Sequence, residues 1–135
     1  ASAAMDTSDG LVATLDQLAR INECAIRIAE PTDALLHPKV GALRETLGLP
    51  AFPFLASHHG EFELVFGVPE DALDRFTGAQ RALGWVPMLV GRVEAGEGLW
   101  LGRRFVDGAR IRNLLRETGG DLRTYATALI DIGFA

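Results

Sequence analysis

The sequence is poor in several features that would place it in a particular class of protein. It contains a single cysteine, Cys24, which excludes an internal disulfide and a cysteine-rich zinc site. No apolar stretch approaches the roughly 20 residues needed to span a bilayer, and the first residues lack the basic and apolar regions of a signal peptide. We therefore expect a cytoplasmic protein that does not enter a membrane.

Positive charge is also scarce. Lysine and arginine together number 13 against 18 aspartates and glutamates, which gives a net charge of -5. This balance argues against sequence-independent binding to nucleic acid or to an anionic membrane. The 135 residues, 48% of them hydrophobic, are the size of one domain with a sizeable core, so we expect a single domain over residues 1–135. Because the chain begins "ASAAM" without an initiator methionine, we interpret it as a fragment of a longer protein.

The hydrophobic periodicity changes several times along the chain, which predicts interleaved helices and strands. The strands lack the regular alternation with helices of a doubly wound parallel sheet. The pattern therefore favours an α+β domain, with a mixed or antiparallel sheet covered by helices. The segment "LPAFPFLASHHG" reads as irregular, with a short helix after Pro53. The expected helices cover residues 10–22, 38–48, 69–84, 107–118 and 121–132. The expected strands cover residues 25–30, 61–68, 85–96 and 97–102, the last two joined as a hairpin by a glycine-containing turn.

The most unusual short stretch is "DTSDG", which places two carboxylates and two hydroxyls just before an apolar helical run. Ser8 or Asp9 can cap the helix, and the charge of Asp9 complements the helix dipole. Capping does not explain Asp6, because a second nearby carboxylate adds repulsion. Mg²⁺ would relieve that repulsion, since it binds through one or two protein carboxylates together with phosphate oxygens and water. A helix cap and a metal site are both compatible with these residues.

Three blocks of the sequence resemble thiamine-monophosphate kinases. "ASAAMDTSDGL" is similar to the "ASAMIDISDGL" of that family, "HHGEFELVFGVPE" to its "GGEDYELLFTVPE", and "VGRVEAGEGLWL" to its "IGRVTEGEGV". The blocks occur in the family order and cover most of residues 1–101. The same superfamily includes aminoimidazole ribonucleotide synthetase and selenophosphate synthetase.

The resemblance implies the C-terminal domain of a two-domain enzyme that uses ATP and Mg²⁺ and acts on a small phosphate-containing substrate. It also implies a fold like the C-terminal domain of aminoimidazole ribonucleotide synthetase. An N-terminal ATP-binding domain would precede this domain and form a homodimer. By the same resemblance, Asp6 and Asp9 approach Mg²⁺, and Ser8 and Gly10 approach the nucleotide.

The second block departs from the family pattern. Where the kinases have "GGEDYE" this chain has "HHGEFE", so the acid associated with substrate becomes Gly60, and Glu61 is the residue that can replace it. The alternative to a catalytic domain is a non-catalytic small-molecule-binding or regulatory module that retains the fold. In either case the isolated chain is expected to lack phosphotransferase or synthetase activity.

Overall fold

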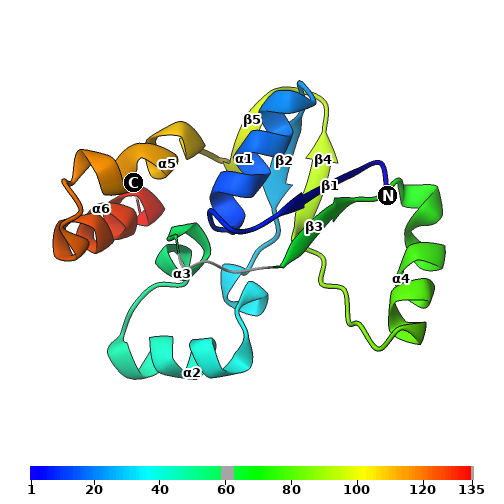
Figure 1. The fold of residues 1–135 in the computed structure, drawn as a ribbon, viewed down its shortest axis with the longest axis horizontal. Coiled ribbons are helices and arrows are strands. Elements are labelled where there is room, and N and C mark those ends of the chain that lie inside the picture. Colours follow the sequence, from blue (N-terminus) through cyan, green and yellow to red (C-terminus); the bar gives the residue numbers. More distant parts are fainter. Residues whose placement is uncertain (59–62, 135) are drawn as a thin grey trace.

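A computed structural model describes residues 1–58 and 63–134 of the chain. Figure 1 shows helices gathered around and beside two small groups of strands. In chain order the elements are β1 (Ala3–Asp6), α1 (Leu11–Ile21), β2 (Ala25–Ile28), η1 (Thr32–Leu35), α2 (Pro38–Leu47), α3 (Phe52–Ala56), β3 (Leu64–Gly67), η2 (Glu70–Ala72), α4 (Leu73–Ala82), β4 (Gly91–Glu94), β5 (Gly98–Leu101), β6 (Arg104–Val106), α5 (Gly108–Glu117) and α6 (Leu122–Phe134). No helix in the described ranges is both long and apolar enough to cross a membrane.

The strands form two sheets. β1 and β3 pair antiparallel, with Asp6 opposite Leu64. The other sheet has the order β4-β2-β5-β6, in which β5 runs parallel to β2 and the remaining pairs are antiparallel. This is the mixed α+β architecture that the periodicity predicts, divided between two sheets.

The predicted hairpin over residues 85–102 is wrong. β4 and β5 do not pair with each other, because β2 lies between them and Ala25 faces both Glu94 and Gly98. The connection between β4 and β5 crosses the start of β2, where a β-carbon built on Gly96 would lie 3.7 Å from the β-carbon of Ala25. Alternating apolar residues identify a strand, but they do not identify its neighbour.

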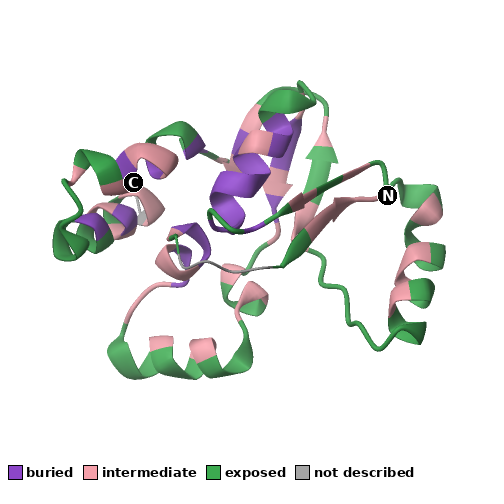
Figure 2. Cartoon of the chain, in the orientation of Figure 1, coloured by how far each residue is buried: buried purple, intermediate pink, exposed green. Residues whose placement is uncertain are grey.

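The core lies between the four-stranded sheet and α1. Ile26 and Leu99 are paired across β2 and β5, and Leu99 is paired with Val106 across β5 and β6, so these buried side chains share one face. α1 contributes Val12, which is fully buried, and most of the other buried positions in Figure 2 lie on α1, β2 and α3. By contrast, α2 and α4 have no fully buried residue. α4 contacts β3 through the Phe76 and Phe66 rings, whose centroids lie 5.4 Å apart.

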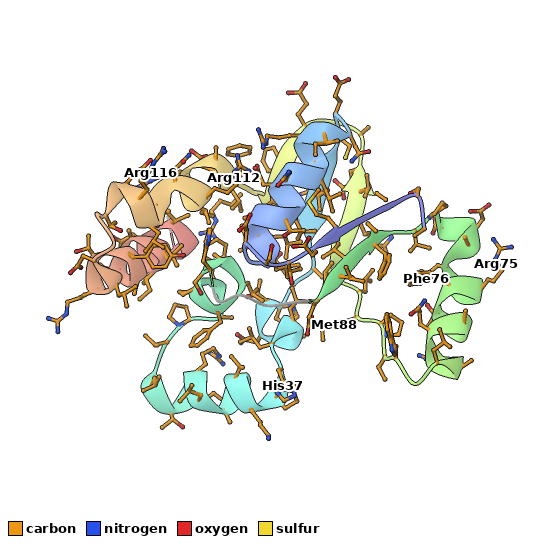
Figure 3. The ribbon with its side chains drawn as sticks, in the orientation of Figure 1. His37, Arg75, Phe76, Met88, Arg112 and Arg116 are labelled. Carbon is orange, nitrogen blue, oxygen red and sulfur yellow. The ribbon has the colours of Figure 1, made fainter. Side chains whose placement is uncertain are left out.

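A buried ion pair joins α1 to α5. The Asp16 side chain on α1 is only 7% exposed, and it accepts a hydrogen bond from the guanidinium of Arg112, which lies where α5 approaches α1 (Figure 3). The guanidinium of Arg20 lies 3.3 Å from the same carboxylate. At the start of α5, a β-carbon on Gly108 would lie 2.3 Å from the β-carbon of Asp16. The beginning of α5 therefore lies very close to α1 at Asp16.

We expect Gly108→Ala to destabilise the chain by about 1 to 3 kcal/mol, because the added methyl group overlaps the Asp16 side chain and forces the two helices apart. Gly78→Ala is the matched control, because nothing lies within 4 Å of the position that its β-carbon would occupy on α4. It should be neutral or stabilising by up to about 1 kcal/mol through helix propensity. Urea unfolding of both variants measures the difference, and equal stabilities would contradict the close packing.

Candidate functional site

The "DTSDG" stretch forms the connection from β1 to the beginning of α1. A tight turn runs from Thr7 to Gly10, closed by a 2.8 Å hydrogen bond from the Gly10 N–H to the Thr7 carbonyl. The buried Thr7 also donates its N–H to the carbonyl of Glu63, 3.0 Å away, just before β3. The first two family-like blocks are thus brought together, although 56 residues separate Thr7 from Glu63.

Asp6 ends β1 with an exposed carboxylate that is organised by Ser8. Its Oδ1 atom accepts hydrogen bonds from the Ser8 hydroxyl at 2.5 Å and from the Ser8 N–H at 3.1 Å. The hydroxyl contact, followed by the N–H contact, lowers the pKa of Asp6 below its ordinary value. Asp6 is therefore an anion at neutral pH.

Of the two alternatives for this stretch, the helix cap by Ser8 or Asp9 is not formed in the structure. The N-cap residue of α1 is Gly10, and no described side chain accepts a capping hydrogen bond from this helix end. Ser8 is instead engaged with Asp6, and the Asp9 side chain is 64% exposed. Capping of α1 therefore does not explain the presence of Asp9.

Glycine is required at position 10 for two reasons. Its φ angle of 91° lies in the region that residues with side chains rarely adopt. A β-carbon there would also lie 2.7 Å from the carbonyl oxygen of Ser57. The beginning of α1 is therefore pressed directly against the end of α3.

His58 follows α3 and faces the turn. Its Nδ1 atom lies 4.0 Å from Oδ1 of Asp9, and its backbone N–H donates to the hydroxyl of Tyr125 on α6 at 3.2 Å. The sequence predicted neither the contact of His58 with Asp9 nor the hydrogen bond of Tyr125 with His58. No local pattern could reveal Tyr125, because 67 residues separate it from His58.

Glu61, the predicted substrate contact, lies outside the described residues, as does its neighbour His59. Within residues 1–58 and 63–134, no group of three or more histidine, cysteine, aspartate or glutamate side chains is placed to hold a metal ion. Any metal in this region would therefore find only part of its ligands in the described chain.

The residues at the turn nevertheless suit part of a Mg²⁺ site. Mg²⁺ in nucleotide sites uses one or two carboxylates and takes its other ligands from phosphate and water. Asp6 and Asp9 are both exposed carboxylates beside the N-terminal end of α1, an end that also favours phosphate. Both hydrogen bonds from Ser8 reach Oδ1 of Asp6, so among described partners its Oδ2 is available.

The fold and this turn define a class: a mixed α+β domain with an acidic turn at the start of its first helix. Comparison with known proteins gives the family. The chain is 37% identical over 95 residues to a thiamine-monophosphate kinase from Halobacterium salinarum, an alignment that covers 70% of this chain and 30% of the kinase. No family model matches the chain.

Two solved structures have a similar fold. A protein from Thermus thermophilus, tt0281, superposes with a TM-score of 0.63 and 31% identity, over 76% of this chain and 32% of that protein. The thiamine-monophosphate kinase of Stenotrophomonas maltophilia K279a gives a TM-score of 0.51 at 23% identity, over 74% of this chain and 31% of the kinase. The second likeness concerns the fold alone.

The resemblance to the thiamine-monophosphate kinase superfamily is thus confirmed. The chain is a relative of the Halobacterium kinase, and it spans about a third of the length of each of these three proteins.

We expect Ser8→Ala to raise the pKa of Asp6 toward its ordinary value, because the variant loses the hydroxyl contact, the larger cause of the lowered pKa, and keeps only the N–H contact. Above about pH 5, Asp6 is ionised in both the folded and the unfolded chain, so the Ser8 contacts contribute fully to stability. That contribution is lost as the pH falls through the lowered folded-state pKa.

Carbon-13 NMR titration of the Asp6 carboxyl measures this change. Asp121 is an internal control, because its pKa is lowered by the distant Thr124 N–H and should not respond to Ser8→Ala. An Asp6 pKa that is the same in both proteins would contradict the role given to Ser8.

Proposed function

We propose that the chain is the C-terminal domain of an ATP- and Mg²⁺-dependent small-molecule kinase or synthetase that resembles thiamine-monophosphate kinase. The observation that carries this proposal is the Asp6–Gly10 turn. It presents two exposed carboxylates at a helix N-terminus, in a chain that is 37% identical to such a kinase over 95 residues. Neither carboxylate is used to cap the helix.

In this proposal Asp6 and Asp9 are ligands of Mg²⁺, and Ser8 and Gly10 contact the nucleotide. When bound, Mg²⁺ would neutralise phosphate charge during phosphoryl transfer. Asp6 is prepared for this role because Ser8 lowers its pKa and fixes one of its oxygens. Gly10 would contribute the backbone at the N-terminal end of α1, an end that favours phosphate. Glu61 is the proposed contact to a small phosphate-containing substrate.

The remaining ligands would come from outside the chain. Phosphoryl transfer depends on positioning and charge neutralisation, which two carboxylates cannot supply alone. We therefore propose an N-terminal domain that completes the ATP site and forms a homodimer. A non-catalytic binding module is the alternative, favoured by the change from "GGEDYE" to "HHGEFE".

We expect Asp6→Asn and Asp9→Asn to weaken Mg²⁺-dependent binding of an ATP analogue to the proposed full-length protein by about tenfold or more, because each removes a charged metal ligand. Asp74→Asn, on the exposed face of α4, is the control and should bind as the parent does. Isothermal titration with and without Mg²⁺ makes the comparison. Unchanged affinity in both turn variants would contradict the proposed metal site.

We also expect the 135-residue chain alone to show no phosphoryl transfer from ATP. Kinases turn over at roughly 1 to 100 per second, and that rate requires the complete clamp around the phosphates. A sensitive assay of ADP release by the isolated chain tests this expectation. Turnover on the order of 1 per second that disappears in Asp9→Ala would show that the chain is a complete enzyme.

A further inference from the structure

The helix α6 reaches the candidate site through one hydroxyl group. Tyr125 is 7% exposed, and its hydroxyl accepts a 3.2 Å hydrogen bond from the backbone N–H of His58. Burial raises the pKa of this phenol, so the group remains a neutral hydroxyl at physiological pH. The hydrogen bond depends on the hydroxyl oxygen of Tyr125, because a phenylalanine at this position would fill the same space without accepting it.

α6 is itself held firmly against α3. Leu129 is 1% exposed and belongs to the main hydrophobic core. Near the end of α6, a β-carbon on Gly133 would lie 2.9 Å from the ring of Phe52, so the two helices are in close contact there. Packing against α3 therefore fixes the position of the helix that carries Tyr125.

The residues that end and follow α3, Ser57 and His58, also contact the Asp6–Gly10 turn. The Ser57 carbonyl lies against Gly10, and the His58 imidazole lies 4.0 Å from the Asp9 carboxylate. The residues that end α3 are thus held between α6 on one side and the acidic turn on the other. His58 contacts both sides: its backbone N–H donates to the Tyr125 hydroxyl, and its imidazole lies beside Asp9.

We infer that Tyr125 is a positioning residue for the acidic turn: its hydroxyl fixes the backbone of His58 and so holds the imidazole beside Asp9. This inference rests on the proposed function for its consequence, since Asp9 matters as a proposed metal ligand. His58 then belongs to the surroundings of the bound nucleotide, and α6 becomes part of the site although the family-like blocks end before it.

The geometry is tested in the isotope-labelled 135-residue chain by NMR. In Tyr125→Phe, the His58 amide should exchange with solvent about 3- to 10-fold faster, as expected for one lost hydrogen bond. Nuclear Overhauser contacts between the His58 ring and the Asp9 side chain should also weaken. Thr127→Ala is the matched control, because it removes an exposed hydroxyl two residues away that donates to the Arg123 carbonyl within α6. It should change neither signal.

The functional consequence is tested in the proposed full-length protein by a double-mutant cycle. Tyr125→Phe should weaken Mg²⁺-dependent binding of an ATP analogue by about 2- to 10-fold, and the effect should disappear in a His58→Ala background. A role in stability alone would lower Tm equally in both backgrounds and leave the affinity unchanged.

The two proposals fail differently. If Tyr125→Phe leaves the His58 amide and the His58–Asp9 contacts unchanged, or if Thr127→Ala changes them equally, the positioning role is wrong whatever the ligand. If those signals change as expected but the parent protein binds no Mg²⁺-nucleotide, the proposed function is wrong and the positioning of His58 stands.

Discussion

The burial of α1 is the constraint on which the rest of the structure depends. This helix is buried along most of its length, and it packs against the four-stranded sheet, α3 and α5. Its apolar residues fix its axis, and the Asp16–Arg112 ion pair fixes α5 beside it. This packing fixes the N-terminal end of α1, and with it the position of the Asp6–Gly10 turn that precedes the helix.

The turn is organised by contacts that leave its charges outside. Thr7 is buried and tied to Glu63, Gly10 is pressed against Ser57, and Ser8 bonds to Asp6, yet the carboxylates of Asp6 and Asp9 remain exposed. The contacts from Ser8 use only Oδ1 of Asp6, and no described side chain caps α1 through either carboxylate. A turn whose backbone is fixed while its two carboxylates stay exposed is suited to a ligand, which is why we assign it to Mg²⁺ and nucleotide.

The sequence predicted much of the fold where the information is local. α1 and α2 follow from apolar spacing and from terminal signals such as the left-handed Gly48, and β2 from its Ile-rich pattern. It missed β1, whose sequence "AAMD" has no β-branched or aromatic residue, and β6, which has only three residues. It paired β4 with β5 because the intervening β2 is distant in sequence. The same reasoning found the exposed carboxylates but not His58 or Tyr125, whose roles exist only once α3 and α6 pack together.

The central claim is that Asp6 and Asp9 bind the metal of a Mg²⁺-nucleotide complex. The most direct measurement is a crystal structure of the proposed full-length protein with Mn²⁺ and a non-hydrolysable ATP analogue, in which anomalous scattering locates the metal. The account predicts a Mn²⁺ peak at a coordination distance of about 2 Å from a carboxylate oxygen of Asp6, Asp9 or both, with phosphate oxygens among its other ligands. A bound nucleotide whose metal ions all lie beyond coordination distance of both carboxylates would contradict it.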